Sequence, residues 1–174
     1  TKKLGDIAQI NMGQSPSSTY YNNEGSGIPL IQGNADIRKR KSIRRVWTTQ
    51  ITKTCDEGDL VLTVRAPVGS VGIASEHSCL GRGVCSLKPV GHDIDFLFHS
   101  LVFVEKRWEK LQQGSTFASA NSSQIAEFPL LITEVIEEQR AIAEALSDVD
   151  ELIESLDKLI AKKRAIKQAA MQQL

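Results

Sequence analysis

The sequence feature best suited to bind a ligand is a dense cluster of basic residues. Six of the eight residues from 38 to 45 are basic, and none of the eight is acidic. The six are Arg38, Lys39, Arg40, Lys41, Arg44 and Arg45. A run of cations without acids concentrates its field on one part of a surface, as phosphate binding requires. The run therefore predicts a nucleic-acid contact, and an ordinary solvated surface is the alternative.

Other polar side chains extend this candidate site. Gln32 and Asn34 precede the run, and their amides can form paired hydrogen bonds to adenine in the major groove, or can serve a turn around Gly33. Arg65, on a predicted loop, adds another positive charge to the candidate site. Ser115 and Thr116 offer neutral phosphate donors in a small polar segment that could equally be a solvated connector.

Enzyme signatures are missing. The chain has no Gly-Lys pair for a phosphate-binding loop and no complete Gly-x-Gly-x-x-Gly fingerprint. It has no adjacent prolines, which adenine methyltransferases carry at their catalytic loop, and no acid two residues before a lysine, as many nucleases have. We therefore expect a chain that is not itself an enzyme and needs no cofactor. A hydrolase is a third alternative, although no nucleophile, base and oxyanion set can be assembled.

The residues best suited to bind a metal are His77, Cys79 and Cys85, but further ligands at suitable spacing are missing. We expect no metal site and reduced thiols, which suit the cytosol. The chain has no run of about 20 apolar residues that could cross a bilayer, and its start has no secretory apolar stretch. The expected location is the cytoplasm, with no membrane contact.

The elements that must position these side chains are short strands followed by helices. Alternation and Gly, Pro or Asn punctuation predict strands at residues 28–32, 42–47, 59–64, 71–74 and 84–88. Apolar residues at spacings of three and four predict one helix over 94–111, with Asp93 near its start and Gly114 at its end. This helix should pack on the strands. Residues 128–132 predict a last strand or extended connector.

The C-terminal region changes character at residue 134. Residues 134–173 contain no Gly or Pro, Thr133 can cap a helix, and acids precede a late basic cluster. Apolar residues recur every seven positions in two series. The seam residues are Ala145, Val149, Leu152, Leu156, Leu159 and Ile166. Such a stripe requires a partner helix, unless the helix folds back along its own domain.

Two domains follow from this pattern. Residues 1–133 carry 15 basic and 12 acidic groups, a net charge of +3, whereas residues 134–174 carry 6 and 9, a net of −3. We predict an α+β protein, in which a β-rich globular recognition domain over 1–133 precedes a long coiled-coil helix over 134–174.

The order of these features resembles one half of the DNA-specificity (S) subunit of type I restriction-modification systems. The motifs that carry the resemblance are Leu4-Gly5-Asp6-Ile7, Gly27-Ile28-Pro29-Leu30-Ile31-Gln32-Gly33, Gly58-Asp59-Leu60-Val61-Leu62, Arg65-Ala66-Pro67-Val68-Gly69, Gln113-Gly114-Ser115-Thr116, Phe128-Pro129 and Glu138-Gln139-Arg140. In that family a target recognition domain reads a few base pairs. A helix spaces it from a second such domain and docks methyltransferase subunits.

The resemblance implies a non-catalytic, sequence-specific DNA-recognition subunit that directs a methyltransferase and endonuclease complex to a bipartite target. Its expected partners are duplex DNA, methyltransferase (M) subunits, restriction (R) subunits as further candidates, and a second copy paired antiparallel through the helix. The alternative is a protein-interaction adaptor that uses the coiled-coil helix without reading DNA.

Overall fold

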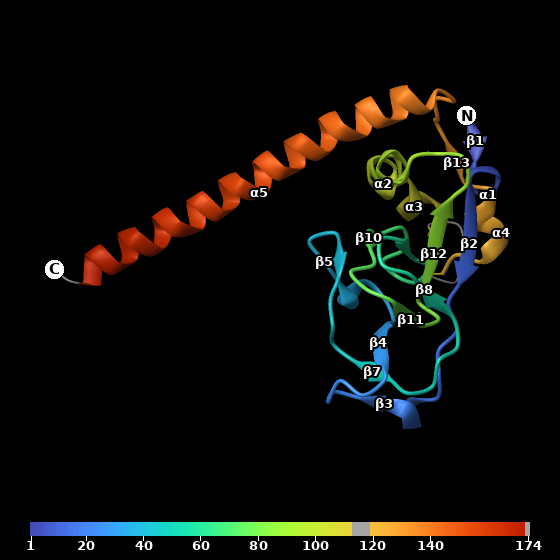
Figure 1. Cartoon of the computed structure of the whole chain (residues 1–174), viewed down its shortest axis with the longest axis horizontal. Helices are drawn as coiled ribbons and strands as arrows, with labels where there is room; N and C mark the ends of the chain where they lie inside the picture. Colours follow the sequence, from blue (N-terminus) through green and yellow to red (C-terminus); the bar gives the residue numbers. More distant parts are fainter. Residues whose placement is uncertain (113–118, 173–174) are drawn as a thin grey trace.

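A computed structural model describes residues 1–112 and 119–172 of the chain. Within these ranges, two main β-sheets, a two-stranded sheet and a group of short helices form a domain from which a long helix projects (Figure 1). The predicted α+β class, with a β-rich domain before a long C-terminal helix, is confirmed.

The larger sheet has six strands in the order β2-β12-β9-β10-β6-β5. Their bounds are Ala8–Met12 (β2), Val84–Pro89 (β12), Leu60–Thr63 (β9), Val71–Ile73 (β10), Lys41–Ser42 (β6) and Ile37–Arg38 (β5). All pairs are antiparallel except β10 with β6. All four residues of β9 are buried, as expected for a central strand that is covered on both faces. The hairpin β5–β6 forms the free edge of this sheet.

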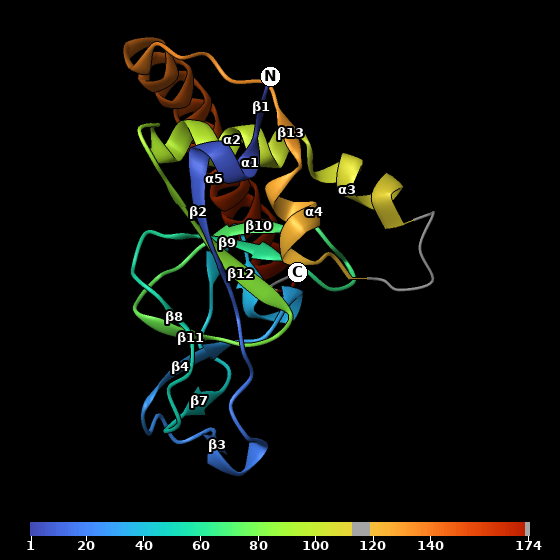
Figure 2. The ribbon, with the colours of Figure 1, turned by 90° about the vertical axis from the view of Figure 1, so that its right-hand side faces the viewer.

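The smaller sheet has five strands in the order β3-β7-β4-β11-β8. Their bounds are Tyr21–Asn22 (β3), Trp47–Thr48 (β7), Ile28–Ile31 (β4), Ser78–Leu80 (β11) and Thr54–Cys55 (β8). Gly27 leads into β4 with φ +87°, and a Cβ there would clash with the carbonyl oxygen of Thr48. Figures 1 and 2 show β3, β4 and β7 at the end of the domain remote from the long helix.

Short elements close the other end of the domain. They are β1 (Lys2–Lys3), α1 (Leu4–Ile7), α4 (Ser122–Ala126) and β13 (Pro129–Leu130). The 3-10 turns η1 (Ser18–Tyr20) and η2 (Asn34–Asp36) lie elsewhere and lead directly into β3 and β5. Strand β13 pairs antiparallel with β1, which joins the two ends of the globular region. Asn121 and Gln124 form a reciprocal cap at the start of α4.

The predicted helix over 94–111 is two helices, α2 (Ile94–Phe103) and α3 (Glu105–Gln112). Asp93 caps α2, as its position predicted, by accepting hydrogen bonds from the backbone N–H groups of Asp95 and Phe96. The single-helix prediction is wrong at Val104, where φ −98° and ψ 4° interrupt the helix. The turn lets Trp108 of α3 stack on Phe128 with ring centroids 3.8 Å apart. Helix α2 packs on β10 and β12, as expected of an amphipathic helix beside a sheet.

Four of the predicted strands agree with β4, β9, β10 and β12, and β13 falls within the predicted element at 128–132. The prediction of a strand at 42–47 is wrong. Residues 43–46 cross from β6 in one sheet to β7 in the other, held by a hydrogen bond from Ile43 N–H to the Asp36 carbonyl oxygen at 2.8 Å. Two sheets cannot share one continuous short strand there, because β6 and β7 pair with different neighbours.

The long helix α5 spans Ile136–Gln172, 37 residues, or about 55 Å at 1.5 Å per residue. It begins two residues after the predicted start. Only Gln139 and Ala143 are buried, and residues 148–172 are all exposed. Over the described residues α5 therefore projects from the domain and does not fold back along it (Figure 1). Among residues 1–112 and 119–172, no helix has the length and apolarity that a transmembrane span needs.

Candidate nucleic-acid interface

The basic run forms the hairpin of β5 and β6 and the segment that follows it. The register pairs Ile37 with Ser42 and Arg38 with Lys41, so Lys39 and Arg40 make the two-residue turn. All six basic side chains of the run are exposed or border solvent. The sequence thus places its densest positive charge on an edge hairpin and its following loop.

Three of the six cations are held by acids of the same domain. Arg40 pairs with Glu105 of α3, Arg44 with Glu76, and Arg45 with Asp36 at 3.2 Å. The hydrogen bond and the charge of Glu76 raise the pKa of the Arg44 guanidinium above its ordinary value. These three charges are therefore partly neutralised, and they contribute less to an external field than the sequence indicates.

Arg38, Lys39 and Lys41 remain. They form no ion pair within the part of the chain that the structure describes. All three are exposed and lie next to one another on the hairpin. These three side chains are the cations of the basic run without an ion pair in the described residues, and we call them the hairpin cations.

Asp36 organises the loop that carries Gln32 and Asn34. Its buried carboxylate accepts hydrogen bonds from the backbone N–H of Gln32 at 2.8 Å and of Gly33 at 3.2 Å, and from Arg45. Both amide side chains are exposed on this loop, which leads directly into β5. The structure therefore brings the amides and the hairpin cations onto consecutive segments that share one buried acid.

Arg65 lies apart from this group. Arg65 lies just beyond Thr63, the last residue of β9. Lys41 pairs with Ile73, and Ile73 pairs with Leu60, the first residue of β9. Arg65 and Lys41 are therefore at opposite ends of this strand. Arg65 is exposed and forms an isolated bridge with Ser119. Ser115 and Thr116 lie outside the described residues.

The histidine and cysteine side chains considered as metal ligands do not come together in the structure. His77 is exposed beside Asp56 at 3.1 Å, whereas Cys79 and Cys85 are buried. Burial raises the pKa of the Cys85 thiol to about 12. The described residues contain no group of three or more His, Cys, Asp or Glu side chains that could hold a metal ion.

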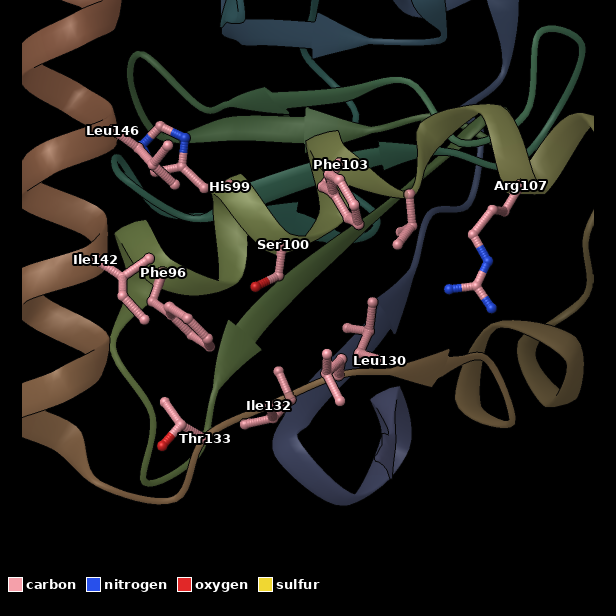
Figure 3. A pocket seen from close by; sticks show the side chains of 12 residues that line it. Phe96, His99, Ser100, Phe103, Arg107, Leu130, Ile132, Thr133, Ile142 and Leu146 are labelled. Atoms are coloured by element: carbon pink, nitrogen blue, oxygen red, sulfur yellow. The ribbon is translucent and has the colours of Figure 1, made fainter.

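A second surface feature is an apolar groove of about 560 Å³ between α2, the connector after β13 and the base of α5. Figure 3 shows His99 and Phe96 of α2 beside Leu146 and Ile142 of α5, whereas Phe103 lies further along α2, toward Arg107 and Leu130. Phe103 is 88% exposed and Leu131 81% exposed. Ile142 and Leu146 also continue the exposed apolar stripe of α5, so the groove is the near end of that stripe.

Three neighbouring residues fasten the base of α5. Glu138 accepts a hydrogen bond from the Thr133 hydroxyl, Gln139 is fully buried, and Arg140 lies 4.0 Å from Asp93. About two turns further on, Ser147 contacts His99 of α2 at 3.1 Å. The helix therefore leaves the domain in a fixed direction.

Sequence reasoning missed several parts of this arrangement. Asp36, Glu76 and Glu105 are distant in sequence from the cations that they neutralise, so only the topology brings them together. The exposed Phe103 lies off the apolar spacing of its helix, and that departure is the signal which could have marked the groove.

The family model of the type I restriction modification DNA specificity domain matches residues 1–163. The chain belongs to this family. The resemblance found in the sequence motifs is therefore confirmed.

The chain is 36% identical over 148 residues to the specificity subunit assigned to the type I restriction enzyme MjaX of Methanocaldococcus jannaschii, covering 84% of this chain and 35% of that one. It is 30% identical over 171 residues to the specificity subunit of the type I enzyme MjaIX of the same organism, covering 90% and 39%. Among solved structures, the HsdS subunit from Thermoanaerobacter tengcongensis superposes with a TM-score of 0.78 and 31% identity, covering 90% and 38%.

A further structure, from work on complex assembly and conformational transition of the type I R-M system, gives a TM-score of 0.83 and 32% identity, covering 94% and 41%. The chain thus spans well under half the length of the relatives it matches, 35% and 39% for the two specificity subunits.

Proposed function

We propose that this chain is the DNA target-recognition component of a type I restriction-modification system. The match of the DNA specificity family over residues 1–163 carries the proposal. The hairpin cations support it, because they supply exposed positive charge that forms no ion pair with an acid of the described residues. Gln32, Asn34 and Arg65 are further candidates for DNA contact, together with Ser115 and Thr116.

In this function the chain selects the sequence and other subunits perform the chemistry. Methyl transfer and cleavage belong to M and R subunits, which are its proposed partners in the complex. The missing cofactor and nuclease motifs support this division, as does the membership of the family. A protein-interaction adaptor without DNA binding is the competing function.

We infer that two copies of this chain pair through α5. The seam residues lie on α5, and all are exposed: Ala145, Val149, Leu152, Leu156, Leu159 and Ile166. An apolar stripe of this length is unfavourable in water, and a closed two-fold dimer is the commonest way for identical chains to cover one.

An antiparallel arrangement fits the charges of the helix. Its first half carries Glu144, Asp148, Asp150, Glu151 and Glu154, and its second half carries Lys158, Lys162, Lys163, Arg164 and Lys167. Antiparallel pairing places opposite charges together, whereas parallel pairing places like charges together. It also brings the far end of the partner helix beside the apolar groove at the base of α5.

Salt-dependent binding to duplex DNA tests the function. If Arg38 and Lys41 each meet a phosphate, these two contacts contribute about −1.8 to the slope of the logarithm of affinity against the logarithm of salt concentration. The triple variant R38Q/K39Q/K41Q should make the slope shallower by at least this amount, while a matched variant of exposed cations outside the basic run and outside α5, K53Q/R82Q/K106Q, should leave it unchanged. Absence of duplex binding at low salt, with and without M subunits, would support the adaptor.

A further inference from the structure

The tip of the β5–β6 hairpin has an unusual backbone for its sequence. Lys39 and Arg40 have φ values of +48° and +63°, and they are the described residues other than glycine that have positive φ. A two-residue hairpin turn with positive φ at both central positions strongly favours Asn-Gly, because a side chain crowds left-handed backbone. The chain instead keeps two long cations there, against the preference of the turn. Residues kept against a local preference point to function.

The hairpin is braced at its base, so the strained tip is held in one place. The Ile73 N–H donates to the Arg40 carbonyl oxygen at 2.8 Å, and Ser75 bonds to Ser42 twice, at 2.8 Å each. Gly72 makes room for the Ile37 side chain, because a Cβ at Gly72 would lie 2.8 Å from Ile37 Cγ2. The ribbon is therefore preorganised before any partner binds.

The two tip side chains have different roles in this bracing. The Arg40 guanidinium bonds to the Glu105 carboxylate and to the Val71 carbonyl oxygen at 3.3 Å, which ties it to α3 and β10. Lys39 has no ion pair in the described chain and is exposed. Lys39 is thus the free cation at the tip, and Arg38 and Lys41 flank it on the two strands.

We propose that the β5–β6 hairpin, at the edge of the six-stranded sheet, presents its tip to the major groove of duplex DNA, with Lys39 contacting base edges and Arg38 and Lys41 contacting phosphates. The major groove is wide enough for a two-stranded β-ribbon, and a lysine can donate to the O6 and N7 atoms of guanine. Phosphate contacts from the flanking strands would fix the register of the ribbon. This inference rests on the proposed function, since it assumes that the chain binds DNA, and it names the element that reads sequence.

A competing role for the tip comes from α5. The pKa of the Glu154 carboxyl is lowered chiefly by the hydrogen bond and charge of Lys158, with smaller effects from Lys39 and Lys41. The hairpin therefore lies within electrostatic reach of α5, in the angle between helix and domain (Figure 1). Lys39 could then steady the helix, and the experiment must separate this role from base contact.

The test is the variant K39N in the full chain, with R44Q as the matched control. Asn accepts left-handed backbone, so K39N should melt no lower than the wild type. R44Q removes the same charge from the same basic run but lies away from the turn. The wild-type chain, with M subunits, is first used to select a preferred duplex from a random-sequence pool. Dissociation constants are then measured on that duplex and on a scrambled duplex of equal length.

K39N should weaken binding to the selected duplex about tenfold, as expected for the loss of one base contact. Binding to the scrambled duplex should weaken clearly less, because only the charge of Lys39 is lost there and no base contact. R44Q should affect both duplexes equally. K39G, which also suits the turn, should repeat the K39N result and thereby exclude an effect of the new amide.

Equal weakening of both duplexes by K39N would overturn the inference and leave Lys39 as a phosphate contact, with the proposed function intact. Unchanged binding to both duplexes would also overturn it, in favour of a contact with α5. Failure of the wild type to bind any duplex at low salt would overturn the proposed function together with this inference.

Discussion

The side chain of Gln139 accepts a hydrogen bond from the backbone N–H of Asp93 at 2.8 Å, which joins the first turn of α5 to the start of α2. The amide nitrogen of Gln139 donates to the Thr133 carbonyl oxygen at 2.7 Å and to His92 Nδ1 at 2.8 Å. Gln139 is fully buried. One amide thus satisfies three groups from two segments, and it fixes where the long helix leaves the domain.

Removing this amide should destabilise the domain. We expect Q139A to lower the free energy of unfolding by about 2 kcal/mol or more, because it leaves a backbone N–H and a carbonyl without partners in a buried site. Q168A, which changes an exposed glutamine of the same helix, should cost less than about 0.5 kcal/mol. Equal denaturation midpoints for the two variants would contradict this role of Gln139.

The sequence predicts the helices that Gln139 joins, but it does not predict the contact between them. The spacing of Leu97, Leu101 and Trp108 correctly identified a buried helix face, because burial imposes a period that the sequence retains. The break at Val104 carries no such signal in the sequence, and it accompanies a tertiary contact, the stacking of Trp108 on Phe128. Local patterns therefore predict elements, while their interruptions depend on tertiary contacts.

The basic run illustrates the same limit at the candidate site. Its charge is visible in the sequence, but the neutralisation of Arg40, Arg44 and Arg45 depends on acids 9 to 65 residues away. The structure thus reduces six cations to the three hairpin cations. The positive φ of Lys39 is equally invisible, because neither lysine nor its neighbours favour that backbone.

The loop before β10 should tolerate no side chain at Gly69. This residue has φ +94°, and a Cβ there would lie 2.6 Å or less from three atoms of Trp108. We expect G69A to cost about 3 kcal/mol or more, from backbone strain and overpacking together. G25A isolates the first effect, because Gly25 has φ +86° with open space around it, and it should cost about 1 kcal/mol. A G69A chain as stable as G25A would show that Trp108 moves freely.

The cysteines should be inert in the folded chain. Burial raises the pKa of the Cys55 and Cys85 thiols to about 12. The thiolate fraction at pH 8 is therefore very small, and it grows only as the pH rises toward that value. A thiol-specific dye at pH 8 should label none of the three cysteines quickly before unfolding and all of them in denaturant. Rapid labelling of the native chain would contradict this burial.

The apolar groove should contribute to pairing between two copies. Phe103 is 88% exposed, so F103E should leave the stability of the monomer within about 0.5 kcal/mol of wild type. If the far end of the partner helix covers this residue, the added carboxylate should raise the dimer dissociation constant at least about tenfold. F103L, which keeps an apolar side chain, should stay close to wild type. Equal dimer affinity for F103E and wild type would leave the groove outside the interface.

The stripe on α5 should decide whether the dimer forms at all. The triple variant L152K/L156K/L159K places three charges on the apolar seam, and it should abolish the dimer in analytical ultracentrifugation while the domain stays folded. The control A161K/A165K/Q168K adds the same charge at exposed positions outside the seam. It should still dimerise. A wild-type chain that stays monomeric at tens of micromolar, with and without M subunits, would instead indicate a different second half.

The response of the dimer to salt should reveal the direction of pairing. In an antiparallel pair the acids around Asp150 face the cations around Lys163, so added salt screens an attraction and should weaken the dimer. In a parallel pair like charges face each other, and added salt should strengthen it. Sedimentation across a salt series separates the two arrangements without any substitution. Antiparallel copies would carry their recognition domains at opposite ends of a rod about 55 Å long. Two identical readers related by a two-fold axis require a palindromic target in two parts, with an unread spacer between them.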